Sequence, residues 1–316
     1  MYISCLLQLT HLFKAYTAIA CLLSTSTFVK RLLLFYYLSS LRYFLMKFII
    51  FALSCIFTQY CIALPQQQLT AGGIALVPLP DYSPAHVQVL FNQQAVPVIQ
   101  HQQERIAIVG IPLNTSDGSQ TLILQAPDFM DTLSFEIQAK DYPEQRITLK
   151  QSQSNKVTPS QEELDRYSRE ATEQKAVYQS FSQHSLTWPS FKMPIKGRIS
   201  SPFGLKRFFN DQPRDPHSGL DIAAPEGKAI AAPADGIVAQ TGDYFFNGQT
   251  VMIDHGQGII SMMCHLSRIK VEKGQAIKQG DIIGLVGQTG RATGPHLHWG
   301  VSINNARVDP LLVLDK

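Results

Sequence analysis

Short apolar runs separated by turn-forming residues fill two long parts of this sequence, and few kinds of fold accommodate that pattern. Between residues 73 and 150, apolar and polar residues alternate, as at residues 87–89, which is typical of strands with one buried face. From residue 198 onward, β-branched residues and glycines are interleaved, and no helical period continues for long. The sequence therefore predicts a mainly β protein, with a small all-β module at residues 64–150 and a compact antiparallel β domain at residues 198–316.

A linker at residues 151–197 separates the two β regions and carries a helical pattern. Apolar residues recur there at intervals of three, four and seven, which predicts one apolar face on a helix at about residues 159–182. These residues are Leu164, Tyr167, Ala171, Tyr178 and Phe181. Thr158 is expected to cap the helix, with Pro159 at its first position and Gln161 completing a capping box. We therefore expect a connecting helix that packs on a neighbour.

The first 63 residues form a basic, apolar leader. They contain five of the 27 basic residues and none of the 24 acidic ones, so the rest of the chain holds 22 basic and 24 acidic residues, a net charge of −2. A strongly basic protein would suggest a polyanionic partner. Because the excess positive charge belongs to the leader, we expect no nucleic-acid partner.

The second apolar stretch of the leader has the parts of a secretory signal peptide. Lys47 gives a basic start, residues 48–56 an apolar run, and residues 61–63 a small-residue cleavage site. We therefore expect translation to start at Met46 and the protein to be exported to the periplasm or cell envelope. One alternative is a membrane anchor, but neither apolar stretch reaches the ~20 uninterrupted residues of a spanning helix. The other is a lipoprotein anchored at Cys55.

The cysteines are not expected to stabilise the fold by disulfide bonds. Four of the five lie in the leader, so a processed chain keeps only Cys264, which cannot form an internal disulfide. Alternation along its strand places Cys264 on the face opposite to His265. We therefore expect a buried structural thiol rather than a reactive one.

Five of the nine histidines fall between residues 217 and 298. His217 and Asp221 lie four residues apart, where turn-forming residues indicate a loop that runs into a strand. His296 and His298 lie two apart in a strand, so both project to the same face. Two imidazoles and one carboxylate make the open three-ligand set of a catalytic zinc, with a position left for water.

Four well-placed groups compete for three ligand positions, so one of them must have another task. His265, on a further strand, and one of His296 and His298 could flank the metal-bound water, orient or deprotonate it, and stabilise the oxyanion of the tetrahedral intermediate. The spacing alone does not decide which of His296 and His298 is the ligand.

Residues 198–314 resemble the M23 family of zinc metallopeptidases, the lysostaphin and LytM type. Three motifs carry the resemblance in the family's order: His217-x-x-x-Asp221, Cys264-His265-Leu266-Ser267 and Gly294-Pro295-His296-Leu297-His298. The resemblance implies that His217, Asp221 and His298 hold one zinc ion and that His265 and His296 are catalytic. This chain has Met263 where many members have a tyrosine.

The resemblance also implies a function: a zinc-dependent endopeptidase that cuts peptide cross-links of peptidoglycan, at the bond from D-alanine to diaminopimelate if the wall is Gram-negative. Four basic residues could flank the cleft and meet the carboxylates of a stem peptide: Lys206, Arg207, Arg214 and Arg291. The β module shows no ligand cluster, so we expect a spacer, docking or regulatory domain through which a regulatory protein or membrane complex could bind.

Two other functions compete with hydrolysis. A non-catalytic relative could use the same cleft to bind and activate a cell-wall amidase, but such relatives typically lack part of the metal set, and none is missing here. A lipoyl- or biotinyl-type carrier is suggested by the hairpin-like sequences at residues 271–274 and 280–284. That interpretation requires a modified lysine at a hairpin tip and leaves the histidines unexplained.

Overall fold

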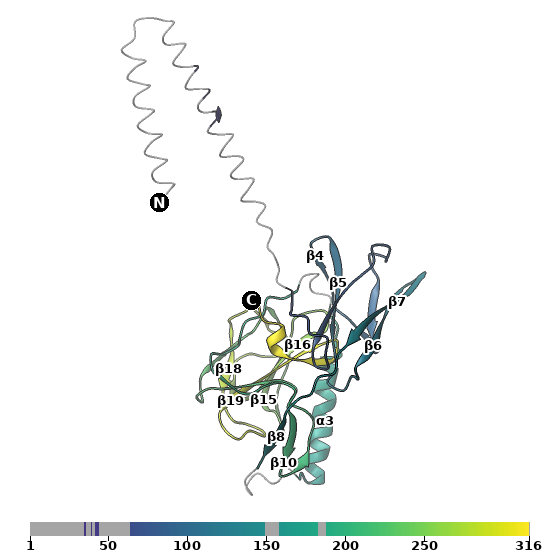
Figure 1. Cartoon of the computed structure of the whole chain (residues 1–316). Coiled ribbons are helices and arrows are strands. Elements are labelled where there is room, and N and C mark those ends of the chain that lie inside the picture. Colours follow the sequence, from purple (N-terminus) through teal and green to yellow (C-terminus); the bar gives the residue numbers. More distant parts are fainter. Residues whose placement is uncertain are drawn as a thin grey trace, which may run out of the picture. The chain divides into compact units, whose positions relative to one another are not determined.

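The computed structural model describes residues 64–148, 158–182 and 188–315, together with Phe35, Ser39, Arg42 and Tyr43 (Figure 1). The predicted signal peptide and its start at Met46 lie outside these residues. The chain divides into two units, Met1–Cys61 and Ile62–Lys316, and the description below concerns the second. Within the described part of the chain, no helix is both long and apolar enough to cross a membrane.

The N-terminal part of this unit consists of two antiparallel sheets. One has three strands, in the order β1 (Ile74–Pro78), β5 (Glu104–Gly110) and β4 (Val98–His101). The other has four, in the order β3 (Gln94–Ala95), β2 (Gln88–Phe91), β6 (Gly118–Ala126) and β7 (Phe129–Ile137). Side chains from both sheets, including Val89, Val109 and Leu124, join one buried cluster. Alternation along β6 and β7 thus turns one face of each strand toward this core.

The C-terminal part is built on a ten-stranded antiparallel sheet, counted over the described residues. Its main path follows the order β17 (Ala276–Ile277), β14 (Gly236–Tyr244), β15 (Gly248–Asp254), β16 (Ile259–Ile269), β19 (His296–Ile303), β12 (Leu220–Ala223) and β9 (Arg198–Ser201). Off this path, β13 (Ala229–Ala231) pairs with β18 (Ile282–Val286), β18 also with β16, and β20 (Ala306–Val308) with β19. The predicted mainly β fold with an antiparallel C-terminal domain is confirmed.

A small fourth sheet lies where the chain leaves the N-terminal module. It has the order β11 (Gln212–Pro213), β10 (Lys206–Phe209) and β8 (Glu144–Ile147), and β8 runs parallel to β10. Phe209 of β10 is buried, and Ile147 of β8 packs against it. Residues just before the linker are therefore held against the C-terminal domain.

Helix α3 (Gln161–Tyr178) occupies the linker and begins later than the sequence suggested. Ser160, not Thr158, is the N-cap: its hydroxyl accepts from the Glu163 amide at 3.3 Å, and a Glu163 carboxylate oxygen accepts from the Ser160 amide at 2.8 Å. This reciprocal pair is a capping box set two residues beyond the expected one. The helix ends before Phe181, whose side chain is 38% exposed, and of its residues only Tyr178 is buried.

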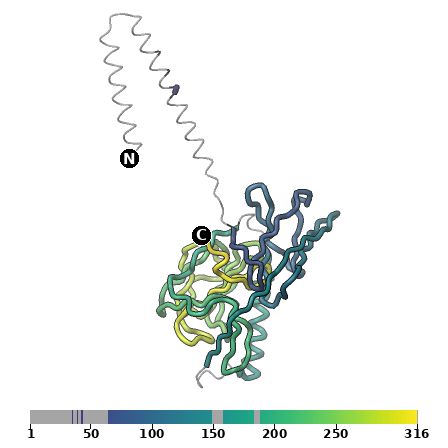
Figure 2. Tube along the Cα trace, in the orientation of Figure 1, coloured from purple at the N-terminus to yellow at the C-terminus, as the bar shows by residue number. Residues whose placement is uncertain are grey.

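The module and the large sheet share part of one core. Ile74 of β1 and Ile108 of β5 belong to the same buried cluster as Val301 of β19 and Val308 of β20. Backbone bonds join the two ends of the unit, from the Gln66 amide to the Leu312 carbonyl at 2.7 Å, so the yellow C-terminal segment runs beside the module's blue strands (Figure 2). We find the module tied into the C-terminal domain rather than suspended from it.

Candidate metal centre

Three side chains with metal-binding atoms meet at the strand pair β12–β19. The His217 Nε2 atom lies 2.8 Å from Asp221 Oδ1 and 3.0 Å from His298 Nδ1, and His298 Nδ1 lies 2.8 Å from Asp221 Oδ1. Within the described part of the chain, these three residues form a group whose donor atoms could hold a metal ion. The structure thus unites the three residues expected to hold the metal.

The sheet register explains why these residues meet. Asp221 of β12 stands directly opposite His298 of β19 in the antiparallel ladder, where facing side chains lie close together. His217 comes from the loop just before β12 and reaches the same point. Gly219 in that loop has no room for a side chain, because a Cβ there would lie 2.6 Å from His298 Nε2 and 2.7 Å from the Trp299 carbonyl oxygen.

The hydrogen bonds of His217 show which of its nitrogens can bind a metal. The Pro202 carbonyl oxygen, which can only accept, lies 2.7 Å from His217 Nδ1, so Nδ1 carries the hydrogen and Nε2 presents a lone pair. That lone pair faces the Asp221 carboxylate and His298. Three electron-rich atoms about 3 Å apart are favourable only with a cation or shared protons between them.

The donor spacing fits a metal ion. Around a tetrahedral zinc ion with bonds of about 2.0–2.2 Å, neighbouring donor atoms lie roughly 3.3–3.6 Å apart. The separations found here, 2.8–3.0 Å, are a few tenths of an ångström shorter. Burial, with the His298 charge as a smaller cause, lowers the pKa of His217 to about 4, so its imidazole is neutral at pH 7. The chemistry and geometry of the donors therefore suit a bound cation.

Asp221 is held at both carboxylate oxygens. Oδ2 accepts from the Arg207 guanidinium at 2.7 Å, while Oδ1 points to the two histidines. The Gln145 side-chain oxygen of β8 in turn accepts from Arg207 Nε at 3.1 Å. This chain of contacts orients the carboxylate.

His265 and His296 lie beside the three candidate ligands. Their ring centroids are 4.8 Å apart, and His296 Nε2 lies 3.9 Å from Asp221 Oδ1. Each uses its Nδ1 atom on a backbone carbonyl oxygen, that of Thr289 for His265 and that of Gly294 for His296, both at 2.8 Å. Those carbonyls fix the tautomers and leave both Nε2 atoms for chemistry. Burial, followed by the neighbouring histidines, lowers the pKa of His265 to about 3.

A distortion in β16 presents His265. Its φ angle is +63°, and the pairing register between β15 and β16 shifts at this point. Met263 and Leu266 belong to the same core cluster although they are three residues apart, which regular alternation does not allow. His265 is therefore the extra residue of a β-bulge. Cys264 is buried, as the sequence predicted, and burial raises the pKa of its thiol to about 12, so the thiol is inert at neutral pH.

A cleft of about 250 Å³ opens at this centre. Its lining includes Asp221, His265, His296, Arg207 and Arg291. Two of the four basic residues expected at the cleft thus line it. Of the others, Lys206 pairs with exposed Asp141 at 3.3 Å, and Arg214 bonds the Gln212 side chain at 2.6 Å.

Gln145, Ser201 and Thr289 make supporting contacts that the sequence did not predict. Ser201 Oγ lies 3.3 Å from His217 Nδ1, and Thr289 supplies the carbonyl that holds His265. These residues belong to β8, β9 and a turn after β18, and no short motif links them to the histidines. Only the strand pairing brings them to the site.

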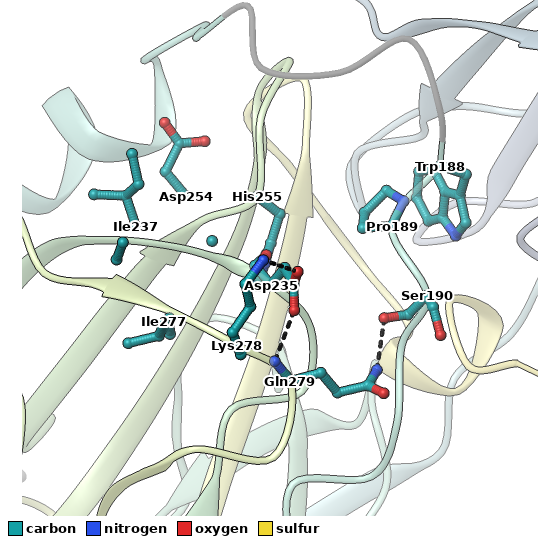
Figure 3. Close-up of a pocket in the computed structure, with 12 residues that line it drawn as sticks. Trp188, Pro189, Ser190, Asp235, Ile237, Asp254, His255, Ile277, Lys278 and Gln279 are labelled. Atoms are coloured by element: carbon teal, nitrogen blue, oxygen red, sulfur yellow. Dashed lines mark hydrogen bonds and ion pairs between the residues drawn. The ribbon is translucent and has the colours of Figure 1, made fainter.

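A larger cavity, of about 560 Å³, lies elsewhere in the fold, around buried His255 (Figure 3). Its lining includes Trp188, Asp235, Lys278 and Gln279, and Asp235 accepts hydrogen bonds from the Lys278 ammonium and the Gln279 amide, both at 2.8 Å. His255 does not belong to the group of described residues whose donor atoms could hold a metal ion. No sequence motif points to this cavity, and both ring nitrogens of His255 have hydrogen-bond partners, the Asp235 carbonyl and the Ser261 hydroxyl.

Comparison with known proteins identifies the fold family. Residues 215–310 match the model of peptidase family M23, and residues 68–140 match that of the peptidase family M23 N-terminal domain. A crystal structure of a putative peptidase M23 from Pseudomonas aeruginosa is 41% identical in sequence, with a TM-score of 0.65; the match covers 78% of this chain and 96% of that one. The chain belongs to peptidase family M23.

Curated relatives match part of the chain. The DD-carboxypeptidase/endopeptidase Mpg of Neisseria meningitidis is 41% identical over 116 residues, and the peptidoglycan DD-endopeptidase ShyA of Vibrio cholerae is 40% identical over 122 residues. These matches cover 37% and 38% of this chain but only 27% and 28% of those proteins. The predicted M23 resemblance is confirmed; the individual roles of the five site residues stay predictions.

Proposed function

We propose that the protein is a zinc-dependent endopeptidase that hydrolyses peptide cross-links of bacterial peptidoglycan. The observation that carries the proposal is the convergence of His217 Nε2, Asp221 Oδ1 and His298 Nδ1 beside two further histidines in one cleft. Two nitrogens and one oxygen are a typical catalytic zinc set. The named activities of Mpg and ShyA support peptidoglycan as the substrate.

In this proposal His217, Asp221 and His298 hold one zinc ion per chain. The ion, when bound, supplies a Lewis acid that polarises the amide carbonyl and makes a water molecule more acidic. His265 and His296 have their Nε2 atoms left for chemistry in the cleft, since their Nδ1 atoms donate to carbonyl oxygens. They are placed to take the proton of the attacking water, to hydrogen-bond the developing oxyanion once protonated, and to return a proton to the leaving amine.

The bond we propose is the one from D-alanine to diaminopimelate. The word DD-endopeptidase in the names of the relatives supports it.

We also propose export to the periplasm or cell envelope, which follows from the signal-peptide pattern and from the location of such a substrate. A regulatory protein or membrane complex could bind through the N-terminal module. The complete donor set argues against a non-catalytic amidase activator, and the M23 fold argues against a lipoyl-type carrier.

Digestion of purified sacculi tests the proposal. Zinc-loaded protein is expected to convert cross-linked muropeptides to monomers, measured by liquid chromatography and mass spectrometry. A chelator should stop the reaction and added zinc should restore it; activity that survives chelation would refute the zinc mechanism. The amidase-activating role would be favoured if the protein bound zinc but released no muropeptides from the sacculi, and if the His265→Ala and His298→Ala variants gave the same result as wild type.

A further inference from the structure

The backbone of His265 depends on the loop at residues 244–248. The His265 amide donates to the Asn247 carbonyl oxygen at 2.9 Å, and the residue has φ +63°. A non-glycine residue keeps such a conformation only where its surroundings hold it. The position of the His265 ring in the cleft therefore depends on where the Asn247 carbonyl lies.

This loop is interlocked with the turn that holds the His265 ring. The Gln249 amide donates to the Thr289 hydroxyl at 2.9 Å, and the Arg291 amide donates to the Phe246 carbonyl at 2.8 Å. Gly248 makes the approach possible, because a Cβ there would lie 2.2 Å from the Thr289 hydroxyl oxygen. The Thr289 carbonyl accepts from His265 Nδ1. Both hydrogen bonds of His265 thus come from one interlocked unit.

Helix α3 is attached to this unit by polar contacts. A Glu170 carboxylate oxygen accepts from the Phe245 amide at 2.8 Å, and Arg166 donates to the Asp243 carbonyl at 2.8 Å. The Tyr167 ring packs edge-on against Phe246, with centroids 5.0 Å apart. The Glu170 side chain is only 12% exposed and is also paired with Arg166 at 2.6 Å.

Apolar burial anchors the last turn of the helix, where Tyr178 packs in a cluster with Met262 and Cys264, but not its middle turns. Of its described residues only Tyr178, the last, is buried, while Leu164 and Tyr167 remain about 40% exposed. A helix that is polar on most of its surface gains little from a hydrophobic face. The specific contacts of its middle turns are those with residues 243–247.

We infer that α3 braces the catalytic cleft, and that Glu170 is a positioning residue that holds His265 in place through the Phe245 amide and the Asn247 carbonyl. The inference rests on the proposed catalytic role of His265. The linker helix is then part of the machinery for hydrolysis and not only a connection between two β regions. Metal binding should not depend on Glu170, because His265 is not among the candidate ligands.

Three variants of the full protein test this. Glu170→Ala is expected to lower kcat on a purified cross-linked muropeptide dimer by about 10-fold or more, as small misplacements of a catalytic group do. KM and the zinc affinity, measured by competition with a chromogenic chelator, should stay within about twofold. Glu170→Gln should restore most of kcat, since its amide oxygen still accepts from Phe245. Glu173→Ala, on the same helix and exposed, is the matched control and should equal wild type.

Hydrogen exchange gives a readout that needs no substrate. In Glu170→Ala, the amides of Phe245 and His265 should exchange at least about 10-fold faster, while those in the N-terminal module should not change. Unchanged kcat and exchange in Glu170→Ala, a parallel loss of zinc, or a Glu170→Gln variant as impaired as Glu170→Ala would each overturn the inference. An inactive wild-type protein would instead refute the proposed function, and the exchange result would still decide whether the helix braces His265.

Discussion

Two regions of the molecule bury histidines, and burial alone does not distinguish them. Burial lowers the pKa of His255 to about 4, much as it lowers that of His217 at the candidate metal centre. The partners differ. His255 donates from Nδ1 to the Asp235 carbonyl at 2.6 Å and faces the Ser261 hydroxyl with Nε2 at 2.8 Å, so both nitrogens are satisfied. His217 has a satisfied Nδ1 but turns Nε2 toward two other electron-rich atoms.

The volumes of the two cavities do not identify the candidate metal centre either. The space around His255, about 560 Å³, is larger than the 250 Å³ cleft at the metal centre (Figure 3). Neither the volume of a neighbouring cavity nor a lowered pKa therefore distinguishes a structural histidine from one at the candidate metal centre. What distinguishes the metal centre is that several lone pairs converge without enough hydrogens to join them. The following experiments test that distinction.

The largest difference is expected from removal of a candidate ligand. His298→Ala should lower zinc affinity by more than the roughly 100-fold typical of changes to groups outside the ligand shell, and it should abolish hydrolysis. The affinity is measured by competition with a chromogenic chelator. His255→Asn is the control from the other region and should bind zinc as wild type does; equal zinc binding by both variants would remove the distinction.

A smaller but still large effect is expected at His265. His265→Ala should reduce kcat by about 10²–10⁴-fold, the usual contribution of a positioned acid or base, while zinc content measured by atomic absorption stays near one ion per chain. His296→Ala should behave in the same way. A variant that loses its zinc together with its activity would show that the residue is a ligand rather than a proton-transfer group.

The free energy of unfolding in acid should depend on the protonation of His255. Its folded-state pKa of about 4 lies below the ordinary histidine value of 6.5, so the unfolded chain binds a proton first as the pH falls. The stabilisation is complete above pH 6.5 and is lost progressively toward pH 4, by about 3 kcal/mol in total. In urea titrations at pH 7 and 4.5, His255→Asn should lose less stability between the two pH values than wild type. An equal loss in both proteins would contradict the assignment.

The smallest effect concerns the glycine next to the ligands. Gly219→Ala places a Cβ 2.6 Å from His298 Nε2 and should cost about 1–3 kcal/mol of unfolding free energy through overpacking, with weaker zinc binding. Gly300→Ala is a matched control, because its Cβ would come no closer than 3.8 Å to the same atom. Thermal melts with and without zinc would compare them, and equal melting shifts would show that the loop can move aside.

The sequence predicted the type of most elements, because alternation and spacing are local properties. It also predicted that His217, Asp221, His296 and His298 gather, since strand geometry makes residues two apart share a face. It could not separate His296 from His298. In the structure, His298 Nδ1 lies 2.8 Å from Asp221 Oδ1 and His296 Nε2 lies 3.9 Å from it, because Asp221 stands opposite His298 in the ladder.

Other features depend on pairings that no local pattern encodes. The bulge at His265 arises where the pairing register between β15 and β16 shifts. A histidine in a strand-like sequence does not by itself indicate a positive φ angle. The Gln145–Arg207 contact requires β8 to run parallel to β10. The helix start was two residues off because two overlapping capping boxes were available, and the Ser160–Glu163 pair formed instead.

The joint core of the two β regions has a consequence for how the chain folds as it is made. Residues just before β1 bond to the last turns of the protein: the Gln66 amide donates to the Leu312 carbonyl oxygen, and the Asp309 amide donates to the Gly72 carbonyl oxygen at 2.9 Å. The Gly110 amide also donates to the Asn304 side chain at 2.7 Å. Contacts this distant in sequence form slowly and cannot close during synthesis. The contacts that tie the N-terminal module to the C-terminal segment can therefore form only once the last residues of the chain have been made.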